Sequence, residues 1–288
     1  MRSKKKINAL SIGLFAAVAV LLAFSQVNAA QENAAGDSPW EKFGVNLGVF
    51  LSATDTSFRI GSGIGLSIDA EEALNLDATN TVFRADALWR FSDNKRHRLD
   101  FTWFSLRRDA TRQIGQDITI KDKDGNPITI NAGTTVEANF DMDIYELAYN
   151  YSFFQDDRID LAVGVGLFIM PLDFGISSSG VIEEDGSARF TAPLPVFGLR
   201  MDVALTPKWF VRSGSQVFYL EYDNFTGSVF EFKVAIEYNP WAHVGIGLGF
   251  DTLRVQLEAD GEDYPSIDFK GNVDFAYSGI QLYLRYFF

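Results

Sequence analysis

The last nine residues of the chain alternate between two kinds of side chain. Every second residue counted back from the end is apolar, whereas Gln281 and Arg285 lie in the other register, and no turn residue interrupts the run. Side chains of a strand point alternately to opposite faces, so the pattern predicts a strand with one uniformly apolar face. That face either covers a soluble core, as in an edge strand of a sandwich, or meets lipid. Its residues are Ile280, Leu282, Leu284, Tyr286 and Phe288.

The first 29 residues have the three parts of a secretory signal peptide. Arg2 and three lysines precede a mostly apolar run over 7–24, and Val27-Asn28-Ala29 places small residues at the cleavage positions. We expect cleavage after Ala29 and a mature domain over 30–288; an uncleaved anchor helix is the alternative. No later stretch approaches the roughly 18 to 20 apolar residues that a spanning helix needs. The mature chain is therefore expected to be either soluble or a barrel.

Composition favours a membrane barrel. Hydrophobic residues make up 47% of the chain, with 26 Phe, 10 Tyr and 5 Trp, yet no long apolar segment follows the signal, because the apolar residues alternate with polar ones. The net charge is −13 even with the basic signal included, which argues against nucleic acid as a partner. The chain has no Cys, so disulfides and thiolate metal sites are excluded.

Ten segments show strand alternation, and the connections between them are alternately short turns and long loops. Period-two patterning is clearest from Ile159 to Ile169. A change of parity near Ile144 predicts either a bulge or the point where the strand leaves the membrane. The faces of the seventh segment are not assigned. An even count is typical of bacterial barrels, and we expect about ten strands, with eight or twelve as alternatives. The segments are 43–53, 82–91, 96–103, 145–153, 159–169, 197–205, 209–220, 230–238, 244–250 and 280–288.

The fold class expected is all-β, a closed antiparallel transmembrane β-barrel. Closure follows because lipid cannot satisfy the free N–H and C=O groups of a sheet edge. The short connections at 92–95, 155–157, 206–208 and 239–242 are expected in the periplasm, and the longer ones outside the cell. These longer loops are 54–80, 110–136, 173–191, 221–227 and 258–274, and the second holds a hairpin-like pattern at 117–120 and 127–130.

Charged residues spaced two apart recur in the strands and so share a face. We expect them to point into the lumen, because an Arg or Lys turned to lipid at mid-depth costs about 2 to 4 kcal/mol. An ordinary solvated surface is the alternative. A barrel of eight strands is just filled by side chains, so ten strands leave a narrow lumen. The predicted lumen charge network is Arg84, Asp86, Arg98, Asp100, Arg158, Asp160, Arg200, Asp202, Glu231 and Lys233.

Several apparent site motifs carry little weight. Gly245-Ile-Gly247-Leu-Gly249 has period two and no following helix, so it indicates strand glycines that make room for inward Tyr283 and Phe287 rather than a phosphate loop. Acidic loop clusters at 122–125, 183–186 and 260–263 lack the ligand spacing of an EF-hand. The two histidines, His97 and His243, both follow short turns. We therefore expect no catalytic residues, no metal, no cofactor and no enzyme activity.

The signal ending in Val27-Asn28-Ala29, the Arg-x-Asp strands, the glycine-alternating strand and the terminal Tyr286-Phe287-Phe288 together resemble Gram-negative outer-membrane barrel proteins that lack an assigned activity. The resemblance implies a location in the cell outer membrane. The partners expected are outer-membrane lipid and lipopolysaccharide, together with the barrel assembly machinery, for which the apolar face of 280–288 serves as the assembly signal. Two functions remain open: a structural barrel or narrow, porin-like pore, and a surface binding protein that uses its acidic outer loops.

Overall fold

The computed structural model describes residues 38–60, 68–69, 77–113, 115, 117–121, 127–178, 186–222, 225–259 and 271–288. The expected signal peptide lies outside these ranges. The three acidic loop clusters also lie outside them, except Gly186 at the end of the second cluster. Within the described residues, no helix is long and apolar enough to cross a membrane. The unit formed by residues 39–288 is considered by itself below.

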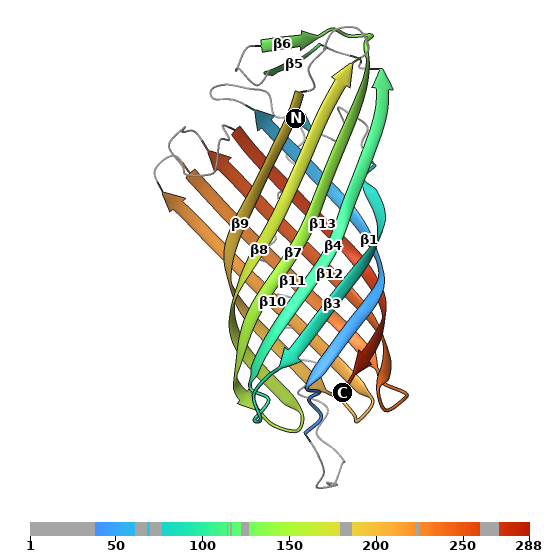
Figure 1. The fold of residues 1–288 in the computed structure, drawn as a ribbon, viewed down its shortest axis with the longest axis vertical. Helices are drawn as coiled ribbons and strands as arrows, with labels where there is room; N and C mark the ends of the chain where they lie inside the picture. Colours follow the sequence, from blue (N-terminus) through green and yellow to red (C-terminus); the bar gives the residue numbers. More distant parts are fainter. Residues whose placement is uncertain are drawn as a thin grey trace, which may run out of the picture. The chain divides into compact units, whose positions relative to one another are not determined.

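This unit is a closed antiparallel barrel of ten long strands, which confirms the expected fold (Figure 1). Each strand pairs with its neighbour in sequence order, and the last pairs with the first from Gly44 opposite Phe287 to Ile60 opposite Gly271. The strands are β1 (Phe43–Ile60), β3 (Thr79–Arg90), β4 (His97–Gln113), β7 (Thr135–Gln155), β8 (Ile159–Ser178), β9 (Gly186–Ala204), β10 (Trp209–Tyr222), β11 (Phe225–Tyr238), β12 (Val244–Ala259) and β13 (Gly271–Phe287).

Three short strands complete the described structure. β2 (Ile68–Asp69) pairs with β1, and β5 (Ile118–Lys121) pairs with β6 (Pro127–Ile130) as a separate two-stranded sheet. The hairpin-like pattern in the second long loop is thus confirmed. We call the end of the barrel with the short connections the turn end, and the opposite end, near β5 and β6, the loop end (Figure 1).

The barrel strands extend well beyond the expected segments, and their polarity inverts along the way. In the half next to the turn end, outward side chains are apolar and exposed; Leu284 is 63% exposed and Leu199 is 62% exposed. Nearer the loop end the outward side chains are polar, such as Asp143 on β7 and Arg254 on β12, while the inward ones are buried and apolar. The first half presents a belt suited to lipid, and the second is built like a water-soluble protein.

This inversion accounts for the parity change near Ile144. Of the two alternatives expected there, the bulge is wrong, and a strand that leaves the membrane near this residue stays a prediction. Alternation continues through Ile144, which is buried and faces inward beside Met142, and the pairing of β7 with β8 keeps one register on both sides of it. The bulge lies at the turn end instead, where the register shifts between Ser152 and Phe154. The change near Ile144 is one of side-chain chemistry on an unbroken strand.

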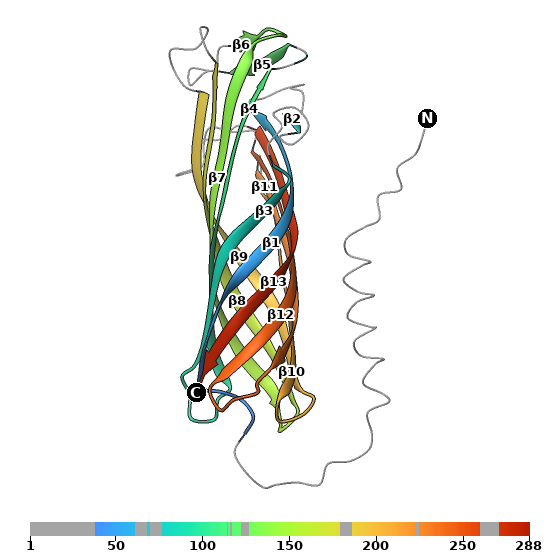
Figure 2. The ribbon, with the colours of Figure 1, turned by 90° about the vertical axis from the view of Figure 1, so that its right-hand side faces the viewer.

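The wall divides into two sheets toward the loop end. Pairing of β3 with β4 stops at Arg84 opposite Phe104, and pairing of β9 with β10 stops at Val217 opposite Phe197. Beyond these points, β4, β7, β8 and β9 remain paired on one side, and β10 to β13 with β1 and β3 on the other (Figure 2). The described part of the barrel therefore becomes a β-sandwich with side chains of both sheets between them.

Two prolines explain why β9 leaves β10. The amide of Ala204 donates to Arg158 before β8, whereas the amide of Leu205 donates to Trp209 on β10, so odd-numbered amides of β9 face β10. Pro193 and Pro195 occupy odd-numbered positions, which face β10, and proline has no N–H to donate. They remove the donors that pairing with β10 would need and leave the ladder to β8 intact, as expected for proline at a strand edge.

Candidate functional site in the barrel lumen

The lumen next to the turn end holds an arginine cluster of five arginines and five carboxylates. Asp202 lies at its centre, and its Oδ2 accepts from Arg98 Nη1 at 2.9 Å and from Arg212 Nη1 at 3.0 Å, as well as from Arg200. Opposite charges from different strands thus offset each other where water is largely excluded. The members are Arg90, Arg98, Arg200, Arg212, Arg285, Glu41, Asp100, Asp160, Asp202 and Glu237.

A second group, the carboxylate-rich cluster, lies one step nearer the loop end. Arg84 Nη1 is 2.5 Å from Asp251 Oδ2, and its Nε is 3.1 Å from Asp86 Oδ1. Lys233 contacts Glu146 and lies 3.1 Å from Glu231 Oε1. These six residues comprise two cationic groups and four carboxyl groups.

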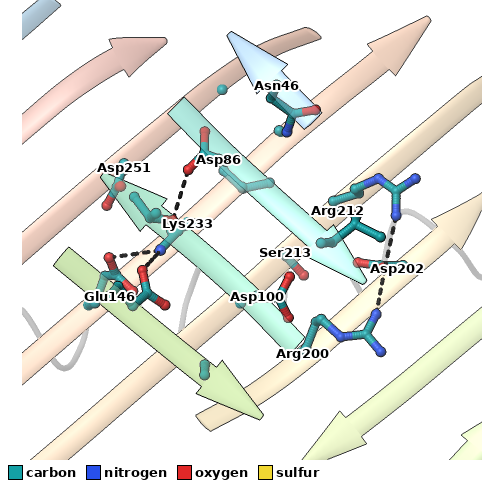
Figure 3. Close-up of a pocket in the computed structure, with 18 of the residues that line it drawn as sticks. Asn46, Asp86, Asp100, Glu146, Arg200, Asp202, Arg212, Ser213, Lys233 and Asp251 are labelled. Carbon is teal, nitrogen blue, oxygen red and sulfur yellow. Dashed lines mark hydrogen bonds and ion pairs between the residues drawn. The ribbon is translucent and has the colours of Figure 1, made fainter. Parts of the chain in front are cut away.

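A cavity of about 170 Å³ lies between the two clusters, and both line it. Figure 3 shows Lys233 directed at Glu146 on one side, and Arg200 and Arg212 both directed at Asp202 on the other. Inward glycines of several strands also line the cavity: Gly44, Gly164, Gly198, Gly214 and Gly249.

An apolar layer lies between the strands on the loop side of the carboxylate-rich cluster. Phe50 and Phe104 meet edge to face with centroids 5.4 Å apart, and Tyr277 packs against both. Arg84 lies under the two phenylalanines at 5.4 and 5.1 Å. The layer comprises Phe50, Phe104, Leu106, Val136, Phe140, Met142, Ile144, Phe168, Met170, Leu172, Leu194, Val196, Val229, Leu253, Val255, Leu257, Val273, Phe275 and Tyr277.

The residues just before β1 cover the turn end of the lumen. Trp40 is 1% exposed, packs against Phe210 on β10, and donates through Nε1 to the carbonyl of Asp156 at 2.7 Å. Glu41 reaches the arginine cluster, where its Oε1 lies 3.0 Å from Arg212 Nη2. A tryptophan and a carboxylate thus anchor this segment inside the barrel.

One of the predicted glycine contacts is present and another differs. A Cβ on Gly247 would lie 2.1 Å from Cζ of Tyr283, so this glycine makes room for the tyrosine, as predicted. At Gly245 the side chain that uses the space is Asn239, whose Oδ1 would be 2.1 Å from a Cβ, and not Phe287. Tyr283 donates to Glu237 Oε1 at 2.8 Å, which links the contact to the arginine cluster.

Nine of the ten predicted lumen charges lie inside the barrel, divided between the two clusters. Arg158 does not: its side chain is exposed in the turn before Ile159, where β8 begins and strand alternation starts. Residues two apart also pair with each other, such as Arg84 with Asp86 at 3.1 Å, and further pairs join separate strands, such as Arg90 with Asp160 at 2.9 Å. The predicted network did not include Glu41, Arg90, Glu146, Arg212, Glu237, Asp251 and Arg285.

Strand parity could have found most of the missed residues. Arg90 lies an even number of residues from Arg84 and therefore faces inward with it. In the same way, Glu237 shares the inward face of Lys233, and Arg285 shares the inward face of Gln281. Glu41 precedes the first strand and leaves no periodic signal. The predicted assembly-signal residues of 280–288 all lie exposed on the outer face, between 53% and 63%, with Phe288 just past the end of β13.

The two histidines lie at the turn end, away from the cavity lining. His97 Nδ1 is 2.6 Å from the hydroxyl of Tyr149, and His243 Nδ1 is 3.0 Å from the carbonyl of Phe287. Among the residues that the structure describes, no three His, Asp or Glu side chains are grouped to hold a metal ion.

One solved structure shows the same fold, and others are similar over most of their length. The outer membrane protease OmpT of Escherichia coli matches with a TM-score of 0.55 at 11% identity, over 89% of this chain and 99% of OmpT. OprG of Pseudomonas aeruginosa has a TM-score of 0.33 and 9% identity, and the match covers 88% of this chain and 99% of OprG. The toluene transporter TodX of P. putida has a TM-score of 0.33 and 7% identity, and the match covers 85% of this chain and 89% of TodX. No protein-family model matches the chain, and no curated protein does. With its apolar belt and closed wall, the chain has the fold of Gram-negative outer-membrane β-barrel proteins.

Proposed function

We propose that the protein is a structural outer-membrane barrel with a lumen closed to solutes. The observation that carries this proposal is the apolar layer, in which side chains of the two sheets meet: the rings of Phe140 on β7 and Phe275 on β13 stack with centroids 6.1 Å apart, although three strands separate β7 from β13 in the wall. A cavity of about 10 Å³ within the layer is at the limit for a single water molecule. An ion crossing this layer would lose its hydration without gaining polar partners, which is strongly unfavourable.

Electrical recording tests this proposal directly. The full-length chain, refolded in detergent and inserted into planar bilayers, is expected to show no steady conductance, and liposomes that contain it should not swell in sugar solutions. A stable single-channel current in the unmodified protein would overturn the closed lumen and favour a narrow pore.

The proposal places the loop end outside the cell and the turn end in the periplasm. Asn131 near the loop end and Asn94 at the turn end are both exposed, and the chain has no Cys of its own. On intact cells, Asn131→Cys should react with an impermeant thiol reagent and Asn94→Cys should not. The opposite labelling would show that the orientation is inverted.

In the proposed orientation the apolar belt contacts lipid and lipopolysaccharide, and the assembly machinery recognises the face of 280–288.

A surface binding protein is the second candidate. The separate β5–β6 sheet adds structure beyond the wall, and Asp109, Asp141, Asp143 and Asp173 place acidic groups on β4, β7 and β8 toward the loop end. A cationic partner would suit this surface. Binding of polylysine to the barrel in nanodiscs, lost at high salt and weakened by Asp141→Asn, would favour this function; equal binding by the variant would oppose it.

The proposed function is non-catalytic. OmpT is a protease, but an 11% identity extends only the fold to this chain. Both histidines lie at the turn end in hydrogen bonds or ring contacts with aromatic neighbours. Cleavage of a peptide library by the purified barrel, lost when acidic residues near the loop end are changed, would contradict this part of the proposal.

A further inference from the structure

Residues 39–41, which we call the strap, cross the mouth of the lumen at the turn end. The strap lies before β1 and outside the sheet. Lys95, in the turn between β3 and β4, donates through Nζ to the carbonyl of Trp40 at 2.6 Å. The Trp40 indole donates to the carbonyl of Asp156, between β7 and β8, and packs against Phe210 on β10. Three strands separate β1 from β8, and three separate it from β10, so the strap spans the opening.

Three arginines of the wall form a socket for the Glu41 carboxylate. Glu41 Oε1 lies 3.0 Å from Arg212 Nη2 on β10 and 3.4 Å from Arg90 Nη1 on β3. Arg285 on β13 contacts the same oxygen. The three arginine side chains are at most 11% exposed. Arg90 Nη1 also donates to the carbonyl of Glu41 at 3.1 Å. The barrel wall thus makes the socket, and the strap supplies its occupant.

Glu41 is the one carboxylate of the arginine cluster that does not come from a strand. The other four are Asp100, Asp160, Asp202 and Glu237, on β4, β8, β9 and β11. Without Glu41 the wall holds five guanidinium groups against these four carboxylates. A buried charge that has lost its partner is costly, and guanidinium groups bind carboxylates through charge-assisted hydrogen bonds. An empty socket would therefore attract a carboxylate from another source.

We propose that the socket is a carboxylate-binding site and that the strap is a releasable lid, which keeps its own carboxylate, Glu41, in the site. The strap precedes the first strand, so it can leave the mouth without breaking any strand pairing. Trp40 lies beside the socket in an apolar space formed with Ala204 and Phe210. The open site therefore fits a peptide segment in which an aromatic residue is followed by an acidic one.

Acetate tests the socket in the full-length chain. Glu41→Ala removes Cγ and the carboxylate, which together have the size of acetate, whereas Glu41→Gln fills the same space without the charge. With ionic strength held constant and chloride as the reference anion, acetate should raise the unfolding temperature of Glu41→Ala by roughly 2 to 4 °C, with saturation. The unmodified chain and Glu41→Gln should not respond. An equal response in all three chains, or none in Glu41→Ala, would overturn the site.

A spin label tests the release of the strap in a chain that keeps Glu41, so this arm remains decisive if Glu41→Ala does not fold. Ser38 is exposed just before the strap, and the chain has no Cys of its own, so Ser38→Cys carries a single label. The dipeptide acetyl-Trp-Glu-amide should compete with the strap and shift the label from an immobile to a mobile spectral component. Acetyl-Trp-Gln-amide should not.

The matched control is a label at Lys208→Cys, which lies exposed in the turn before β10 and should respond to neither dipeptide. An unchanged spectrum of the Ser38→Cys label with acetyl-Trp-Glu-amide would make the strap a permanent anchor and overturn the releasable lid. An equal shift with both dipeptides would show that the carboxylate is not what the socket recognises. None of these outcomes alters the expected lack of conductance, because the apolar layer lies farther along the lumen.

Discussion

Arg84 on β3 and Asp251 on β12 form a buried ion pair, with Nη1 2.5 Å from Oδ2, although β13 and β1 separate their strands in the wall. Arg84 Nε also holds Asp86, and its guanidinium lies under Phe50 and Phe104. This arginine therefore joins the carboxylate-rich cluster to the apolar layer, and its loss should be felt in both.

The first prediction concerns stability. Arg84→Ala leaves Asp251 and Asp86 buried without their cation, which costs about 3 to 5 kcal/mol when the partner stays charged. The variant should unfold at a clearly lower temperature by circular dichroism or by the gel shift of the heated barrel. Arg254→Ala is the control, because Arg254 is half exposed on the outer face beside Asp274 and such a pair contributes at most about 1 kcal/mol. Equal losses would contradict the prediction.

The second prediction concerns the closure of the lumen. Phe104→Ala removes a buried ring from the apolar layer, which should destabilise the barrel by about 3 to 5 kcal/mol and produce brief channel openings in bilayers. Phe101→Ala changes the same residue type on the same strand, but Phe101 faces outward and is 42% exposed. Its conductance should match that of the unmodified chain. Openings of similar frequency in both variants would mean that the layer is not the barrier.

The third prediction concerns Gly247. Gly247→Ala forces a methyl group against the ring of Tyr283, and overpacking of this kind costs about 1 to 3 kcal/mol. Gly249→Ala should be tolerated, because the nearest atoms to its Cβ, those of Ala235 and Val234, are 3.5 Å away. Thermal unfolding of the two variants measures the difference. The double variant Gly247→Ala/Tyr283→Ala should lose less stability than the sum of the two single losses, because the methyl group no longer meets the ring. Strict additivity of the losses would argue against the contact.

The fourth prediction concerns the opening between β9 and β10. Replacing Pro193 and Pro195 by Thr restores two amides on the side of β9 that faces β10. The double variant should extend the pairing beyond Val217 opposite Phe197. Hydrogen exchange followed by mass spectrometry should show slower exchange in peptides covering 217–222. Unchanged exchange there would show that the shape of the sandwich, and not the prolines, separates the strands.

The fifth prediction concerns assembly. The carbonyl of Phe288 accepts from the amides of Lys42 and Phe43 at 2.8 Å each, and its amide donates to Phe43, so the last residue helps close β13 onto β1. Phe288→Asp places a charge on the apolar face and should lower the yield of heat-modifiable barrel in the outer membrane. Phe287→Asp changes the neighbouring residue of the other register and should have a smaller effect. A normal yield from Phe288→Asp would contradict the assembly role.

The alternating sequence determined the wall of this barrel. Side-chain direction along a strand depends only on residue parity, so the outward belt, the inward charges and the count of ten strands could all be predicted from local patterns. Closure could also be predicted, because lipid leaves no partner for an unpaired edge. The apolar layer was missed because all of its residues except Phe50 and Phe168 lie outside the segments expected to be strands, in stretches where the polar face turns outward and the phase of the pattern inverts.

Tertiary structure decided which side chains meet. Parity places Arg84 and Asp251 in the lumen, but their contact depends on how far each strand is shifted along the barrel and on how the wall curves, and neither is encoded in a single strand. The same holds for Glu41, which follows no periodic pattern and joins the arginine cluster because the segment before β1 folds into the barrel. Arg158 has suitable spacing, yet it lies in a turn where parity no longer fixes direction. Local sequence set the faces of each strand, and the closed geometry of the sheet set the charge pairs, the cavity and the apolar layer.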